Sequence, residues 1–240
     1  MIRTMPLVAA MLAVALVATA GTSPAKTGQQ RDRCARKGSV TLISTKLVRV
    51  YRNRRATFDA LAYACHRPTG RATQLGAIPG FYEYGGRRAT AVRGSIVAYG
   101  LKVDPDGDEG SPAYSIVVVR LPFRGRAWED APQFDAVHTE PFDPAADDNL
   151  AVARLVIAPN RTIAYTTCTD FSSTEPDRCV RPVQNPRVVA VPYDPAKHAY
   201  GTAILIDQSP NIDPRSLRLS PSGSRLAWNA GDQKRSVPTP

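Results

Sequence analysis

A short motif, in which an aliphatic residue is followed by alanine and an aromatic residue, recurs along this chain of 240 residues. It occurs as Leu-Ala-Tyr at 61–63, Val-Ala-Tyr at 97–99, Ile-Ala-Tyr at 163–165 and Leu-Ala-Trp at 226–228. The last two copies each follow an apolar segment and a turn that contains proline. A strand–turn–strand unit that recurs in this way is typical of repeat folds, in which small sheets stack on one another. The chain is therefore expected to adopt a repeat architecture.

The spacing of the motif and the strand signals around it define the expected fold class. The central alanines lie 36, 66 and 63 residues apart. A propeller blade takes about 40–50 residues, so the first interval fits one blade, and the longer two fit blades with extended loops at 104–112 and 169–186. Short β-branched segments occur at 40–44, 47–51, 114–119, 187–191 and 203–206. No helical periodicity appears beyond the N-terminal segment. The sequence predicts an all-β protein of antiparallel four-stranded blades, a small or partial β-propeller with about 3–4 blades.

The alternation of side chains along a strand assigns a direction to each motif residue. The aliphatic and aromatic residues should share one face of the sheet, and the alanine should point to the other face, where a small side chain lets the neighbouring blade approach. In the two proline turns, Asn160 and Gly223 are expected to take the left-handed backbone conformation.

Residues 220–228, Ser-Pro-Ser-Gly-Ser-Arg-Leu-Ala-Trp, resemble the WD40-like (PD40) repeat of TolB-type β-propellers, with the pattern S-P-D-G-x-x-[IL]-A-[FYW]. Ser222 replaces the usual Asp, and the looser copy at 159–165 lacks the Gly, so the repeat is degenerate. The resemblance implies four-stranded blades and a binding role, as in many relatives, without identifying a partner. Because propellers usually need at least four blades to close, either residues 40–51 complete the last blade, or the propeller is open and exposes a sheet edge.

The N-terminal segment has the features of a secretory signal. Arg3 precedes an apolar run at 7–17, and Ala-Thr-Ala at 18–20 forms a cleavage site. We expect a signal peptide at 1–20, a flexible leader at 21–33, the propeller-like domain at 34–231 and a polar tail at 232–240. An uncleaved anchor is the alternative, although the apolar run is about half the length of a membrane span. The protein is expected to be secreted or extracytoplasmic, with no membrane span after signal removal.

The four cysteines are interpreted through this location. An even number in an exported chain favours disulfides, and four cysteines allow three connectivities. We expect the pairs Cys34–Cys65 and Cys168–Cys179, since each would then remain within one repeat. A zinc site is the alternative, but the spacings do not match paired C-x-x-C ligands.

The formal net charge of +10 conceals two regions of opposite sign. Residues 31–71 carry eleven Lys or Arg against two Asp, whereas residues 103–149 carry three Arg against eleven Asp or Glu. Both regions could be solvated surfaces. Alternatively, the basic region contacts an anionic partner such as a cell-envelope polymer, and a protein partner is the other option. Nucleic acid is not expected, because the protein is exported and its basic residues are not interleaved with aromatic ones.

Chemistry-bearing residues are few. Asp104, Asp106 and Asp108 resemble the opening of a calcium loop, but Glu109 stands in place of the Gly and Ser115 in place of the closing Glu. Calcium at these three residues is the metal candidate, a solvated acidic loop is the alternative, and no other cofactor is expected. No histidine lies in a metal or nucleophile motif.

We therefore expect a secreted or cell-surface binding module rather than an enzyme. One alternative is an extracellular glycan hydrolase that uses carboxylates from 104–109 and 140–148. The other is a non-catalytic structural exported domain.

Overall fold

The computed structural model describes residues 33–53, 61–77, 90–103, 113–124, 126–127, 136–138, 150–169 and 186–240. They belong to one compact unit, Asp32–Pro240. These residues form β-strands and turns, and no helix element occurs among them. Among the described residues, no helix is long and apolar enough to cross a membrane.

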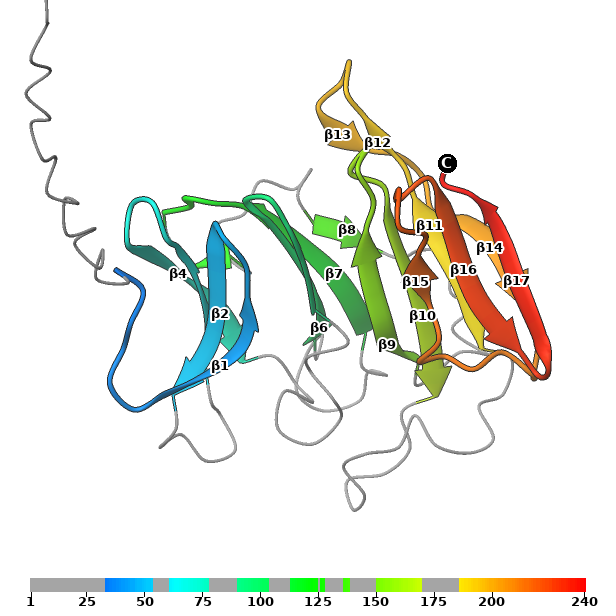
Figure 1. Ribbon diagram of the computed structural model, residues 1–240, viewed down its shortest axis with the longest axis horizontal. Coiled ribbons are helices and arrows are strands. Elements are labelled where there is room, and N and C mark those ends of the chain that lie inside the picture. The colour runs from blue at the N-terminus through cyan, green and yellow to red at the C-terminus, as the bar shows by residue number, and fades with distance from the viewer. Residues whose placement is uncertain are drawn as a thin grey trace, which may run out of the picture. The chain divides into compact units, whose positions relative to one another are not determined.

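The strands form four sheets of three or four antiparallel strands, which we call blades 1 to 4 (Figure 1). Blade 1 contains β1 (Ser39–Ser44), β2 (Val48–Asn53), β3 (Leu61–His66) and β4 (Arg71–Ala77). Blade 2 contains β5 (Thr90–Arg93), β6 (Ile96–Val103), β7 (Ala113–Arg120) and β8 (Ala136–His138). Blade 3 contains β9 (Leu150–Ile157), β10 (Ile163–Thr169), β11 (Arg187–Val191) and β14 (Ile204–Gln208). Blade 4 contains β15 (Arg218–Leu219), β16 (Arg225–Ala230) and β17 (Gln233–Pro238). A separate hairpin, β12 (Tyr193–Asp194) and β13 (Ala199–Tyr200), lies between β11 and β14 in the chain.

The predicted fold class is confirmed. In blades 1 to 3, neighbouring strands follow the order of the chain, as in a strand meander, and every pair is antiparallel. The second and third strands, β6 and β7 in blade 2 and β10 and β11 in blade 3, are neighbours in their sheets, and the extended loops expected at 104–112 and 169–186 lie almost wholly outside the described residues. The result is a partial β-propeller-like fold of four blades.

The repeated motif packs consecutive blades against one another as its alternation predicts. Tyr99 is buried in the core between blades 1 and 2, Tyr165 between blades 2 and 3, and Trp228 between blades 3 and 4. The central alanines face the other way: Ala98 is buried against blade 3, and Ala164 against blade 4. Each aromatic side chain therefore faces the preceding blade, and each alanine provides the close approach for the following one.

The two proline turns differ in a way that the sequence did not predict. Gly223 has a positive φ of 75°, as expected, but in the earlier turn Arg161, not Asn160, is left-handed, with φ 70°. The Asn160 side chain instead accepts a hydrogen bond from the backbone N–H of Thr162 at 3.1 Å, closing an Asx turn. Arg161 thus occupies the place that glycine holds in blade 4.

At the ends of the domain, the structure excludes one of the two alternatives for residues 40–51 and corrects the expected polar tail. The N-terminal strand β1 pairs with β2 inside blade 1, so residues 40–51 do not complete the last blade. The expected polar tail at 232–240 is largely β17, which pairs with β16 from Gln233 to Pro238. Its polar side chains belong to an edge strand with a solvated face, and such a strand resembles a tail in sequence.

Strand β17 forms one edge of blade 4 and has features that protect it from pairing with other chains. Lys234 is exposed, and Pro238 has no backbone N–H to donate. In addition, the guanidinium of Arg225 donates a hydrogen bond to the backbone carbonyl of Ser236 at 3.1 Å. The edge of blade 4 at β17 is therefore poorly suited to strand addition by another chain.

Candidate functional site

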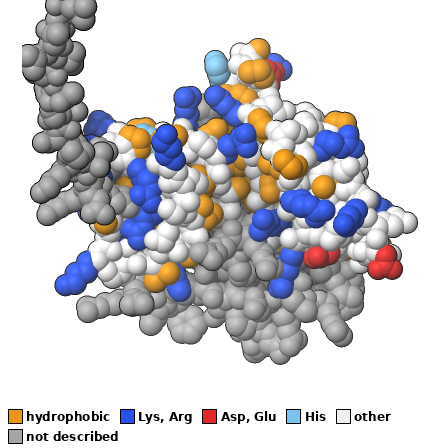
Figure 2. Space-filling model, in the orientation of Figure 1, with side chains coloured by type: hydrophobic (Ala, Val, Ile, Leu, Met, Phe, Trp, Pro, Cys, Tyr) orange, Lys and Arg blue, Asp and Glu red, His pale blue; other side chains and the backbone are white. Residues whose placement is uncertain are grey.

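A basic pocket lies on the face of blade 1 that points away from blade 2. Its volume is about 460 Å³. Its described lining consists of Ala35, Arg36, Lys37, Thr41, Arg49 and Arg67. Four of these residues are cationic, and none is a carboxylate. In Figure 2, Lys and Arg side chains lie over blade 1 and also over blade 4, while the Asp and Glu visible on that view lie away from blade 1. We call this the basic pocket.

Arg49 supplies a fixed charge to the wall of the pocket. It lies on β2 and is 8% exposed. Its guanidinium donates hydrogen bonds to Thr41 Oγ1 at 2.9 Å, to the Cys34 carbonyl at 2.5 Å and to Ser39 Oγ at 2.8 Å. It also lies 5.0 Å from the centre of the Tyr51 ring. All three acceptors are uncharged, so the charge is held in place and oriented but not neutralised by them.

A disulfide positions the other side of the pocket. Cys34 and Cys65 are bonded, with Cα atoms 5.7 Å apart, and both are fully buried. This pair was predicted from the sequence and is confirmed. Cys65 belongs to β3, so the bond ties the segment before β1 to the blade, and Arg36 and Lys37 follow Cys34 after one intervening residue, Ala35. The disulfide therefore holds two of the four pocket cations beside the other two.

The segment before β1 has further anchors on blade 1. The Arg33 guanidinium donates to the Pro68 carbonyl at 2.9 Å, in the turn between β3 and β4. Ser39 donates to the Arg36 carbonyl through both its backbone N–H, at 3.2 Å, and its hydroxyl, at 2.6 Å. The rings of Tyr51 and Tyr63 lie next to the disulfide and stack with their centres 5.5 Å apart. The segment is thus held in one conformation without pairing as a strand.

Several predicted site residues lie outside the described part of the chain. These are Asp104, Asp106 and Asp108, Cys179, and the carboxylates of 104–109 and 140–148. The backbone of Cys168 lies in β10, and its pairing with Cys179 stays a prediction. Calcium binding and glycan hydrolysis likewise stay predictions. Within the described residues, no group of three His, Cys, Asp or Glu could hold a metal ion.

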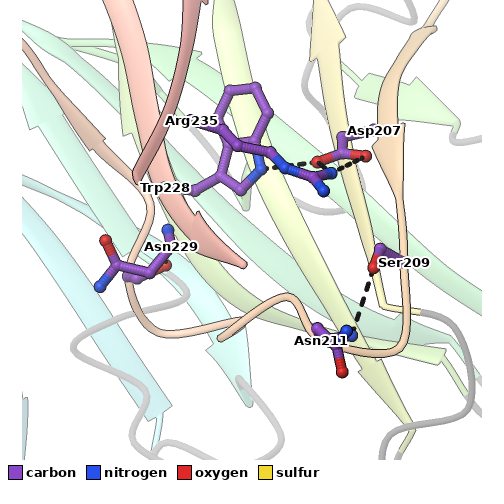
Figure 3. Close-up of polar contacts among 7 residues, drawn as sticks. Asp207, Ser209, Asn211, Trp228, Asn229 and Arg235 are labelled. Atoms are coloured by element: carbon purple, nitrogen blue, oxygen red, sulfur yellow. Dashed lines mark hydrogen bonds and ion pairs between the residues drawn. The ribbon is translucent and has the colours of Figure 1, made fainter. Parts of the chain in front are cut away.

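The sequence did not reveal a polar cluster that joins blades 3 and 4 (Figure 3). Asp207 on β14 accepts a hydrogen bond from Trp228 Nε1 at 2.7 Å and two from Arg235 Nη1 at 2.8 and 3.0 Å. The Asp207 side chain is 14% exposed, and that of Arg235 is 39% exposed. The three groups satisfy one another, so this cluster stabilises the interface between blades rather than presenting donors to a ligand.

Two buried hydroxyl groups lie between blades 1 and 2. Tyr99 and Thr90 are cross-strand partners in blade 2, and they are 0% and 4% exposed. Neither hydroxyl has a hydrogen-bond partner. Burial raises the pKa of Tyr99 far above its usual value, so the phenol is neutral at any physiological pH. An unpaired phenol in this position lowers stability and performs no visible chemistry.

Comparisons with known proteins give weak similarities to solved structures alone. No protein-family model matches the chain, and no curated protein matches it significantly. Among solved structures it is similar to a prolyl endopeptidase, with 10% identity, TM-score 0.48, and coverage of 84% of this chain and 28% of that one. TolB from Acinetobacter baumannii gives 12% identity, TM-score 0.36, and coverage of 79% and 37%. A puromycin-hydrolysing peptidase from Mycobacterium tuberculosis gives 10% identity, TM-score 0.40, and coverage of 83% and 30%. The chain spans about a third of the length of these structures, and similarity at this level carries no argument about activity.

Proposed function

We propose that this protein is an extracytoplasmic, β-propeller-like binding module that retains an anionic cell-envelope polymer through the basic pocket. The observation that carries the proposal is the pocket lining, in which Arg36, Lys37, Arg49 and Arg67 face one space. Several positive charges around one concave surface raise the local concentration of an anionic ligand and favour its binding.

The location is supported by two features that are independent of the pocket. The Cys34–Cys65 disulfide is stable in oxidising compartments and rare in the cytosol. Residues 1–20 have the composition of a secretory signal, as described above. Export also argues against nucleic acid as the anionic partner. A WD40-like repeat of the TolB type stays part of the proposal and rests on residues 220–228.

The pocket geometry favours a polymer with repeated charges over a single tightly enclosed anion. Three donors of Arg49 are already committed to the protein, so Arg49 contributes charge rather than a free fork for bidentate binding. Arg36 and Lys37 are exposed. Exposed cations interact with a ligand mainly through long-range attraction, which salt screens over about 8–10 Å. Binding should therefore weaken as salt increases.

The test is retention of the purified protein on immobilised anionic polymers, with a neutral dextran column as reference. Polygalacturonate supplies carboxylates, and polyphosphate supplies phosphates. We expect retention at low salt on at least one of them and elution as salt rises. The double variant Arg36→Gln/Lys37→Gln should elute earlier than the wild type.

The matched control removes the same number of charges elsewhere. Arg218 and Lys234 are exposed on blade 4, so Arg218→Gln/Lys234→Gln lowers the net charge by the same amount. If the wild type is not retained on either polymer, the proposed function is wrong. If the control loses as much retention as the pocket variant, net charge rather than the pocket is responsible, and the proposal also fails.

A further inference from the structure

The hairpin β12–β13 is an addition to blade 3 that presents side chains beyond the sheet. Figure 1 shows it projecting from the end of β11. Its strands pair with each other and with no other strand, through Tyr193 opposite Tyr200 and Asp194 opposite Ala199. The two tyrosine rings meet edge to face, with centres 5.2 Å apart. A hydrogen bond of 2.8 Å from Gly201 N–H to the Pro192 carbonyl closes its base. The hairpin is therefore a rigid projection.

Two strained residues converge on one phenol of this hairpin. Among the described residues, Arg161 and His198 are the non-glycine residues with left-handed φ, at 70° and 52°. Arg161 Nη1 donates to the Tyr193 hydroxyl at 2.9 Å, and the guanidinium lies 4.8 Å from the centre of that ring. His198 Nδ1 lies 3.4 Å from the same hydroxyl. Left-handed conformations of such residues are unfavourable and concentrate at functional sites.

Lys197 and His198 are exposed, and Arg161 and Tyr193 are partly exposed. The Tyr193 hydroxyl accepts from Arg161, and whether it donates to or accepts from His198 Nδ1 depends on the tautomer of the imidazole. Arg161 has five N–H donors, and the Tyr193 hydroxyl takes one of them. Lys197 is 80% exposed at the tip of the hairpin.

The carboxylate beside these donors is already engaged. Asp194 Oδ1 accepts hydrogen bonds from the backbone N–H groups of Ala196 at 2.9 Å and Lys197 at 3.3 Å. These bonds, that from Lys197 first, lower the pKa of Asp194. Its other oxygen lies 3.6 Å from Lys197 Nζ, an exposed ion pair that contributes little. The cations Arg161 and Lys197 thus lie on or beside a hairpin whose one carboxylate, Asp194, is engaged by Lys197 and the turn backbone.

We propose that Arg161, Tyr193, Lys197 and His198, here called the hairpin site, bind an anionic group such as a carboxylate or a phosphate. The site gives the protein a second contact on the anionic polymer that the basic pocket retains, so the inference rests on the proposed function. Two contacts on one polymer raise the apparent affinity above that of either contact alone. Phosphate and carboxylate share the recognition chemistry, and the two test polymers distinguish them.

The left-handed backbone allows a variant that removes the site without damaging the fold. Glycine adopts φ values of 70° and 52° more readily than arginine or histidine. Arg161→Gly/His198→Gly therefore removes both side chains and relieves backbone strain. A melting temperature equal to or above that of the wild type verifies folding. Lys197→Gln provides a second variant, with a substitution at an exposed tip.

The experiment compares dissociation constants for polygalacturonate and polyphosphate at low salt among four proteins: wild type, Arg161→Gly/His198→Gly, the pocket variant Arg36→Gln/Lys37→Gln and the charge control Arg218→Gln/Lys234→Gln. We expect the hairpin variant to bind the preferred polymer at least about fivefold more weakly than the wild type, and the control to stay near the wild type. Lys197→Gln should weaken binding in the same direction.

The outcomes separate this inference from the proposed function. If the wild type and the control bind while the pocket variant binds weakly and the hairpin variant binds within about fivefold of the wild type, the hairpin site is wrong and the proposed function stands. If the wild type binds neither polymer, both fail. If the hairpin variant and the charge control lose affinity equally, the hairpin site is wrong, because net charge then accounts for the loss.

Discussion

The stacking of two proline turns leads to a sharp prediction at Gly223. This residue lies in the turn before β16, with φ 75°, and a Cβ built on it would lie 2.4 Å from Cδ and 2.5 Å from Cγ of Pro159. Pro159 belongs to the corresponding turn of blade 3. Gly94, in the turn between β5 and β6, has φ 59° and no atom within 4 Å of the same construction. The two glycines thus share a backbone conformation and differ in their surroundings.

The expected magnitudes follow from this difference. Alanine in the left-handed region costs roughly 1–2 kcal/mol, and Gly94→Ala should show this cost alone. Carbon atoms pack at about 3.5–4.0 Å, so at Gly223 the new methyl group overlaps a stiff proline ring. Overpacking typically costs a further 1–3 kcal/mol. Gly223→Ala should therefore lower the free energy of unfolding by about 2–5 kcal/mol in total.

Urea unfolding of the purified variants measures both effects. A double variant, Pro159→Ala/Gly223→Ala, should be less destabilised than the sum of its single changes, because removing the ring relieves the overlap. If Gly94→Ala and Gly223→Ala lower the free energy of unfolding equally, or if the double variant shows no coupling, the two turns do not pack as described. The turn of blade 4 would then not pack against that of blade 3 as described.

Three further predictions concern a buried phenol, the disulfide and the ion pair between blades. Tyr99→Phe should raise the free energy of unfolding by about 1 kcal/mol, since it removes an unpaired buried hydroxyl; a destabilised variant would mean that the hydroxyl is satisfied. Because the pKa of Tyr99 is raised in the folded state, its neutral phenol does not reduce the free energy of unfolding below about pH 10, and that free energy falls as the pH rises above this value. Urea unfolding at neutral and high pH should show a smaller fall in free energy for Tyr99→Phe than for the wild type. Cys34→Ser/Cys65→Ser opens a loop with a sequence separation of 31 residues, and it should lower the free energy of unfolding by about 3–4 kcal/mol. The folded variant should also be retained less strongly on the anionic polymer. Unchanged retention would show that the disulfide does not position the pocket. Asp207→Asn removes the charged partner of Arg235 and should lower the free energy of unfolding in urea by about 1–3 kcal/mol. The loss should lie nearer the lower figure because Arg235 is partly exposed. An unchanged urea midpoint would mean that this pair does not stabilise the interface between the blades.

The fold was largely predictable because the repeated motif carries its own geometry. Alternation along a strand places Ala164 opposite to Tyr165, and a small residue on one face with a large one on the other defines how the next blade packs. The end of the domain was less predictable. The side chains of β17 are exposed or half-buried, so its sequence is polar, and its pairing with β16 depends on the register between two strands.

The candidate sites were predictable only as tendencies. The excess of positive charge in 31–71 indicated a basic region, but many of its cations lie outside the described pocket lining. The hairpin site had a weaker signal. A left-handed position in the turn equivalent to that of Gly223 could have identified Arg161, yet the sequence favoured its neighbour Asn160, because asparagine adopts this conformation more often.

The sequence by itself indicated the all-β class, a count of about 3–4 blades, the direction of the motif side chains and a preference for the Cys34–Cys65 pair. These depend on local periodicity and on residues that belong to one repeat. Only the tertiary structure decided that Arg36, Lys37, Arg49 and Arg67 share a pocket, and that Arg161 and His198 meet at Tyr193. Each of these groups joins residues from different strands and turns. Their convergence depends on strand register and loop conformation, which the packing of the whole domain determines and no local pattern encodes.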